Sequence, residues 1–290
     1  MKANKRTDHF PHMLNLPALL ILLSLLLVPL ITLLLTSFQS GILSGKNEFV
    51  GLRNYIYILT HRRYLQMVFT TLVYCSGTVT LSYLLGVGGA LILDQYFPGR
   101  SLARVLFLIP WAVSISVTSL IWSWILDWQF GIVNVAMQRM GLAPVGWLFM
   151  RGWSMVSVIF VTSWRDSPFI CLTVLAALQN IPPQLYDAGK IDGAGGWSLF
   201  WNITVPQLRS ITGVVVLMLC IWAFRRISYV LMLTGGGPSN TTQTLVLGIH
   251  DDAFSAFEFG RSSALSVLMT IFASIYVVFY MRHTKTTEVV

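Results

Sequence analysis

Residues 187–206 read DAGKIDGAGGWSLFWNITVP and form a polar, glycine-rich connection between two long apolar segments. The connection follows Pro182 and Pro183, and proline lacks the backbone donor that a continuing helix needs. Within it, Gly193 permits a sharp turn that a Cβ atom would hinder. At its end, Pro206 closes the polar stretch before the next apolar segment begins. This pattern predicts a helix–turn–helix that projects from the apolar part of the chain.

The two short helices of this connection are expected over residues 185–191 and 198–203. Asp187 would lie near the start of the first helix, where a carboxylate is favoured by the helix dipole and is free to pair with a cation on a partner. A compact pair of helices of this kind has the shape of a knob that fits a groove.

Around this connection the chain alternates long apolar segments with short polar ones. A membrane-spanning helix needs about 20 predominantly apolar residues. Six segments meet this requirement, namely 16–37, 67–93, 103–125, 155–178, 211–233 and 262–281. We therefore predict an all-α integral membrane protein in which residues 16–281 form one domain of six transmembrane helices and contain the loop 182–206. The tails 1–15 and 282–290 would then lie on the same side of the membrane.

The composition agrees with a membrane protein and argues against several other classes. Of the 290 residues, 55% are hydrophobic and 10% are charged, whereas soluble domains carry about 25% charged residues. The net charge of +8 comes from scattered cations rather than from a basic run, so we expect no nucleic-acid partner. The histidines and cysteines lack the spacing of metal ligands, so we expect no metal site.

Three further features concern the spans and their outer connections. Residues 49–59 are too short and too polar to span and are expected to form an amphipathic helix at the outer interface. Small residues in the second span offer a face for close helix packing, or simply reflect ordinary bundle packing; these are Gly86, Gly89 and Ala90. An aromatic belt is expected toward the outer end of the third span, from Trp111, Trp122, Trp124 and Trp128.

Four charged residues fall inside predicted spans. Arg165 and Asp166 lie in the fourth span, near a kink expected at Pro168, while Arg225 and Arg226 lie in the fifth. A charge at the bilayer centre costs about 2.5–3.5 kcal/mol, so such residues normally face a cavity or a partner. They form either a polar substrate site or a structural ion pair between helices. Because three cations face one anion, we hypothesise an anionic or strongly polar substrate.

The loop 187–206 resembles the EAA loop of permease subunits in bacterial ATP-binding-cassette (ABC) importers. That pattern is E-A-A, three residues, G, nine residues, I-x-L-P, and this chain departs from it at Asp187, Gly189 and Val205. Aspartate keeps the charge but shortens its reach, and glycine weakens a helix by about 0.5–1 kcal/mol relative to alanine. The resemblance implies a cytoplasmic loop that docks on an ATPase through Asp187, Ala188, Gly189, Asp192, Gly193, Ala194, Ile203 and Pro206.

Further motifs resemble the carbohydrate-uptake branch of these importers, which includes the maltose-type and glycerol-3-phosphate-type permease subunits. The motifs cover nearly the whole chain and lie at residues 51–55, 131–134, 233–245 and 259–267. Placed on matching positions, the substrate contacts that the resemblance implies are Thr162, Asp166, Phe169, Ala223, Arg226 and Tyr229. Arg165 and Arg225 join them as charged candidates.

The resemblance also implies the partners. A second homologous permease subunit, an ABC ATPase dimer and a periplasmic or extracellular substrate-binding protein would complete an importer in the bacterial cytoplasmic (inner) membrane, with both termini cytoplasmic. Because the chain lacks the GxxxxGK[ST] motif, ATP and Mg²⁺ would be bound by the partner ATPase, and this chain would bind no cofactor and catalyse no reaction.

Two other functions remain as alternatives. A secondary transporter that works without an ATPase would need internal repeats and broken helices, and the sequence indicates neither. A membrane enzyme would need paired catalytic groups at one depth, and no such cluster is evident.

Overall fold

The computed structural model describes residues 10–40 and 48–285. The chain divides into two compact units, the first made of residues 1–61 and 249–271 and the second of residues 62–248 and 272–290. Most of the two predicted tails lies outside the described residues. Where the tails are described they are helical, because the first helix begins at Phe10 and the last ends at Lys285.

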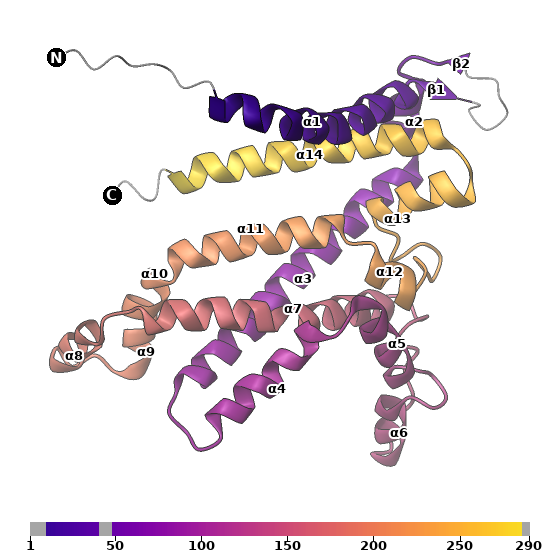
Figure 1. The fold of residues 1–290 in the computed structure, drawn as a ribbon. Helices are drawn as coiled ribbons and strands as arrows, with labels where there is room; N and C mark the ends of the chain where they lie inside the picture. Colours follow the sequence, from indigo (N-terminus) through magenta and orange to yellow (C-terminus); the bar gives the residue numbers. More distant parts are fainter. Residues whose placement is uncertain (1–9, 41–47, 286–290) are drawn as a thin grey trace, which may run out of the picture. The chain divides into compact units, whose positions relative to one another are not determined.

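The first unit consists mainly of helices (Figure 1). It holds α1 (Phe10–Ser37), α2 (Arg53–Thr60), a π-helical turn (Asp251–Ser255) and the first part of α14 (Phe259–Lys285). It also contains one short antiparallel strand pair, β1 (Gln39–Ser40) and β2 (Glu48–Phe49), which the sequence did not indicate. Strands of two residues leave no alternating pattern that a sequence reading would detect.

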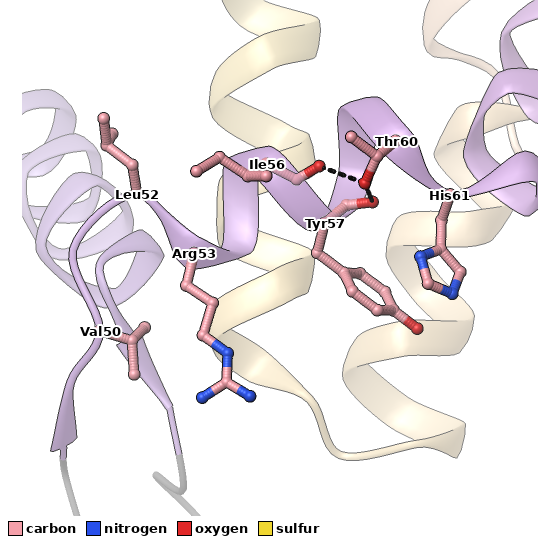
Figure 2. A pocket seen from close by; sticks show the side chains of 7 residues that line it. All are labelled: Val50, Leu52, Arg53, Ile56, Tyr57, Thr60 and His61. Carbon is pink, nitrogen blue, oxygen red and sulfur yellow. Dashed lines mark hydrogen bonds between the residues drawn. The ribbon is translucent and has the colours of Figure 1, made fainter.

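The short helix predicted over residues 49–59 is confirmed as α2, but it begins later, at Arg53, and Phe49 belongs to β2. Asn54 fixes α2 to the end of α1, because its side-chain amide donates to the carbonyl oxygens of Ser37 and Gln39, at 2.9 and 3.0 Å. Figure 2 shows Arg53, Tyr57 and His61 directed toward the same side of α2, as a spacing of four residues requires. They line an open hollow of about 550 Å³, and the rings of Tyr57 and His61 stack at 3.9 Å.

The second unit is a helical bundle built on the crossing of two long helices, α3 (Arg62–Asp94) and α7 (Trp153–Gln179) (Figure 1). Small residues bring their backbones close together. A Cβ atom on Gly86 would lie 2.5 Å from Cβ of Ile170 and 3.0 Å from the carbonyl oxygen of Ser167. The packing face predicted for the second span is therefore confirmed, and Gly89 likewise faces the ring of Phe107.

The remaining helices of the second unit are shorter. They are α4 (Arg100–Ala112), α5 (Ile115–Ile125), α6 (Ile132–Arg139), α8 (Pro183–Ile191), α9 (Gly196–Leu199), α10 (Val205–Gln207), α11 (Arg209–Arg225), α12 (Ser228–Leu233) and α13 (Leu245–His250), whose last two residues belong to the first unit. The hydroxyl groups of Tyr83 and Thr212 join α3 to α11 at 2.7 Å.

Two of the six predicted spans are broken. The third is divided into α4 and α5, whose axes differ by 100°, and the fifth is interrupted after α11 at Arg226. By length and composition four described helices are able to cross a membrane, or six if two bent pairs each form one span, namely α4 with α5 and Gly196–Gln207 with α11, which is bent by 65°. The expectation that the chain has no broken helices is therefore wrong, and the count of six depends on these bent pairs.

Candidate functional site: a buried ion pair and a protruding loop

A buried ion pair joins α7 to the break after α11. Nη1 of Arg226 donates to Oδ2 of Asp166 at 2.6 Å, across 60 positions of sequence. The side chains of Asp166 and Arg226 are only 2% and 11% exposed. Nη1 of Arg165 lies 3.6 Å from the other carboxylate oxygen, Oδ1. Two guanidinium groups therefore share one carboxylate, which leaves one net positive charge in the cluster.

The break in the fifth predicted span places Arg226 in this cluster. The helical backbone of α11 stops at Arg225, and Arg226 is extended, with φ −86° and ψ 117°. A helix resumes at Ser228, so the ring of Tyr229 lies beside Arg226, whose guanidinium carbon is 5.6 Å from the ring centroid. A cation at this distance from an aromatic face is electrostatically stabilised.

Several buried polar atoms of the cluster have no hydrogen-bond partner among the described residues. They are Nε of Arg165, Oδ1 of Asp166 and the hydroxyl oxygen of Tyr229. A buried polar group without a partner costs about 1–3 kcal/mol, and most such groups are bonded to protein or to ordered water. The cluster therefore offers donors and an acceptor to a polar molecule that reaches it.

Tyr74, which the sequence reading missed, belongs to the same cluster. This fully buried residue of α3 places its hydroxyl group 3.2 Å from Oγ1 of Thr162. A detectable signal was available, because buried polar residues recur every four positions along α3, at Thr70, Tyr74, Thr78 and Ser82. A spacing of four places them on one face of a helix.

The other predicted substrate residues have different surroundings. Ala223 is buried in the apolar core beside Tyr74 and Tyr229. Phe169 packs between Trp111 and Trp222, with ring centroids 6.1 and 5.0 Å away. Arg225 is exposed, and no carboxylate of the described chain lies within 4.0 Å of it. The expected excess of two cations is therefore reduced to one within the cluster itself.

The loop that follows α7 folds as two short helices joined at Gly193, as predicted. Gly193 has φ +82°, a conformation that favours glycine. The amide of Gly193 donates to the carbonyl oxygen of Lys190, and the amide of Ala194 donates to that of Gly189, at 3.0 and 2.9 Å. This pair of bonds is a Schellman motif, which satisfies carbonyl groups at the end of α8.

The details of the loop differ from the prediction in two ways. First, α8 begins at Pro183, so Asp187 lies beyond its first turn and pairs instead with Lys190 at 3.6 Å. Second, the second helix runs from Gly196 to Gln207 through a π-helical turn (Phe200–Thr204), and Pro206 lies inside it. Proline is tolerated there because a π-helical turn precedes it and only one residue of helix follows.

Close packing makes the loop rigid. A Cβ atom on Gly189 would lie 2.6 Å from Cδ2 of Leu199 and 3.2 Å from Cδ1 of Ile203. The glycine that departs from the EAA pattern thus lets the two short helices approach each other. The hydroxyl groups of Tyr186 and Thr204 add a bond of 3.0 Å between them.

The outer surface of the loop carries large apolar side chains. Ile191 is 86% exposed and Trp197 is 76% exposed, and Trp197 forms an aromatic group with Phe200 and Trp201. Exposed apolar groups gathered in one place mark a surface that contacts either another protein or a membrane. The predicted docking residues Asp187, Ala188, Asp192, Gly193 and Pro206 are also exposed, whereas Gly189, Ala194 and Ile203 are half-buried.

Within residues 10–40 and 48–285, no three His, Cys, Asp or Glu side chains are grouped closely enough to hold a metal ion.

Known proteins resemble this chain over most of its length. The family described as the binding-protein-dependent transport system inner membrane component matches residues 79–284. The sulfoquinovosyl glycerol transport system permease protein SmoG of Agrobacterium fabrum is 33% identical over 271 residues, which are 92% of this chain and 88% of that protein. The trehalose/maltose transport system permease protein MalF of Thermococcus litoralis is 30% identical over 282 residues, which are 97% and 95% of the two chains.

The fold is also similar to that of a solved transporter. A chain of a bacterial ABC transporter involved in the import of the acidic polysaccharide alginate superimposes with a TM-score of 0.83, over 97% of this chain and 96% of that chain, at 19% identity. Nothing in these similarities supports the alternative of a secondary transporter. This chain therefore belongs to the family of binding-protein-dependent transport system inner membrane components.

Proposed function

We propose that this chain is a permease subunit of an ABC importer for a sugar or sugar derivative. The observation that carries the proposal is the rigid loop 182–206, which presents exposed apolar side chains around Gly193 and leads directly into α11. The two relatives are named for transport of sulfoquinovosyl glycerol and of trehalose and maltose, which supports a carbohydrate substrate for this chain.

The proposed mechanism is alternating access driven by a separate ATPase. The ATPase dimer binds ATP and Mg²⁺, closes, and moves the loop 182–206, which is joined to α7 and α11. Asp166 lies in α7 and Arg226 directly follows α11, so movement of these helices opens or closes the polar cluster. A second homologous permease and a soluble binding protein complete the assembly in the bacterial inner membrane, and both termini of this chain are cytoplasmic.

The buried cluster is the proposed substrate site. Asp166 neutralises Arg226 at 2.6 Å, whereas Nε of Arg165 has no partner within the described chain. Guanidinium groups bind carboxylates, sulfonates and phosphates through paired hydrogen bonds. The cluster has one net positive charge, which favours a sugar that bears an anionic group. The unbonded hydroxyl group of Tyr229 is available to a sugar hydroxyl.

Purification with the native neighbouring subunits tests the importer assignment. The chain is expected to elute with a nucleotide-binding ATPase and a second permease in fixed ratio, because Ile191 and Trp197 need a partner surface. Elution of the chain alone, or as a homo-oligomer without ATPase, would overturn the proposal.

Transport by reconstituted complexes tests the substrate class. Arg165→Gln is expected to reduce uptake of an acidic glycoside about tenfold or more while affecting a neutral analogue less, since hydrogen bonds to charged groups contribute about 1.5–3 kcal/mol. Arg225→Gln is the matched control, because Arg225 is exposed and lies outside the cluster. Equal loss for both sugars, or equal effects of the two variants, would contradict an anionic substrate.

A further inference from the structure

A second polar and aromatic hollow lies at the other end of the second unit from the loop 182–206. Its volume is about 410 Å³, and its walls include Trp128, Gly146, Phe149, Arg151 and Ser239. The loop 182–206 follows the last residue of α7, whereas Phe149 and Arg151 precede the first. The 27 residues of α7 separate the two ends by about 40 Å. The segment before α7, which lines the hollow, and the docking loop after α7 are therefore at opposite ends of the bundle (Figure 1).

Two exposed aromatic rings give the hollow its apolar surface. The rings of Trp128 and Phe149 meet edge to face, with centroids 5.6 Å apart, and both side chains remain exposed. Aromatic faces at the mouth of a pocket bind the apolar C–H face of a sugar ring, because they combine a large flat area with little conformational freedom.

Asn134 holds this wall in place. Its side-chain amide donates to the carbonyl oxygens of Asp127, Trp128 and Val145, and its Oδ1 accepts from the amide of Val145 and from Nε1 of Trp147. One buried side chain thereby ties together the segments before α6 and before α7. A site held this way needs little ordering when a ligand binds, which lowers the cost of binding.

The loop after α12 forms the opposite wall. Ser239 and Asn240 both have positive φ, 48° and 62°. Non-glycine residues persist in this region only where neighbours hold them, and they gather at binding sites. Here Oγ1 of Thr242 donates to the carbonyl oxygen of Gly237, and that of Thr241 to the carbonyl oxygen of Pro238, both at 2.8 Å. Ser239 is exposed at the edge of the hollow.

Arg151 gives the hollow a charge preference. Its side chain is exposed, and no carboxylate of residues 10–40 and 48–285 lies within 4.0 Å of its guanidinium group. We propose that this hollow is a separate binding site for an acidic glycoside, whose ring packs on Trp128 and Phe149 while its acid group pairs with Arg151. The site would hold the sugar before it reaches the buried cluster, and in this respect it rests on the proposed import function.

Cysteine protection in the assembled transporter tests the site. Ser239→Cys places a thiol at the edge of the hollow, and a charged maleimide measures its accessibility, with the unmodified chain as the background for Cys75, Cys171 and Cys220. Methyl glucuronide is expected to slow labelling by a factor of about 1 + [L]/Kd, which is about tenfold near ten times Kd. Methyl glucoside is expected to protect less, since it cannot pair with Arg151.

Matched variants assign the effect to the two parts of the site. Trp128→Ala is expected to abolish protection by both sugars, whereas Trp124→Ala, an exposed tryptophan outside the hollow, is expected to preserve it. Arg151→Gln should weaken protection by the glucuronide about tenfold, as the loss of one charge-assisted contact implies, and Arg139→Gln should not.

Three outcomes would overturn the site. They are no protection at any sugar concentration, equal protection in Trp128→Ala, and protection by sugar-free binding protein alone, which would make the hollow a protein contact. Each leaves the import function intact as long as the complex co-purifies with its ATPase and transports a sugar. Loss of those two properties would instead refute the proposed function.

Discussion

The ion pair between Asp166 and Arg226 allows a quantitative prediction for stability. Removal of one partner from a buried pair costs about 3–5 kcal/mol, because it leaves an uncompensated charge. The loss of stability in Asp166→Asn should lie near the upper end of this range, since the variant leaves two guanidinium groups without their shared carboxylate. Arg226→Gln should lie near the lower end, because Arg165 at 3.6 Å still neutralises part of the charge on Asp166.

A double-mutant cycle distinguishes this pairing from two independent contributions. The double variant Asp166→Asn, Arg226→Gln removes both charges of the pair and leaves only Arg165. Its loss of stability should therefore fall short of the sum of the single losses by about 0.5–3 kcal/mol, the range found for residues in contact. Arg225→Gln serves as the control, and a change within about 0.5 kcal/mol is expected at this exposed position.

The assay is reversible unfolding of the purified chain in mild detergent, followed by loss of helical circular dichroism as denaturant is added. Additivity within about 0.3 kcal/mol would refute the pairing. So would a loss in Arg225→Gln as large as that in Arg226→Gln, because the destabilisation would then follow from removing any cation near the end of α11.

Four other predictions concern two glycines and one asparagine. Gly86→Ala should destabilise the bundle by about 1–3 kcal/mol, because its Cβ would overlap Ile170. Gly88→Ala is the control and should not destabilise it, because Gly88 faces open space. Equal unfolding midpoints of the two variants would contradict this prediction. Gly193→Ala should cost about 1–2 kcal/mol of local strain at φ +82° and keep part of the substrate-stimulated ATP hydrolysis. Gly193→Arg should abolish that hydrolysis without preventing membrane insertion, since a Cβ atom at this position meets nothing within 4 Å in this chain and only a partner would be obstructed. Unchanged stimulation of ATP hydrolysis by substrate would argue against docking at Gly193. Asn134→Ala should destabilise the fold by about 2 kcal/mol or more in denaturant titrations, whereas Asn202→Ala, whose amide bonds only within its own exposed helix, should have little effect.

Much of the fold was predictable from apolar length alone. Segments such as 67–93 and 155–178 contain few charges over more than 20 residues, and each forms a continuous helix. The breaks were not predictable in the same way. Neither Val113 nor Arg226, the extended residues at the two breaks, is a residue type that interrupts a helix, so hydropathy predicts a continuous span in both segments. At the first of these breaks the axes of α4 and α5 differ by 100°.

The candidate site was likewise predictable only in part. The turn at Gly193 was predictable, because a local spacing fixes a local conformation. The partner of Arg226 was not predictable, since Asp166 lies 60 positions away in the sequence and the neighbouring Arg225 offers the same guanidinium group. Tyr74 was missed because a single tyrosine in an apolar helix resembles ordinary core. Only its four-residue spacing with Thr70, Thr78 and Ser82 distinguishes it.

The interruption at Arg226 has a mechanical consequence. Backbone hydrogen bonds make α11 a stiff rod of 17 residues, about 25 Å long, that begins directly after the loop 182–206. A displacement of Arg209 is transmitted along this rod to Arg225, where the helix ends and the extended residue Arg226 forms a joint. Beyond the joint, α12 is packed on α5 and α7. Any change in the angle between this rod and α12 is therefore concentrated at the joint, which holds the guanidinium group bound to Asp166.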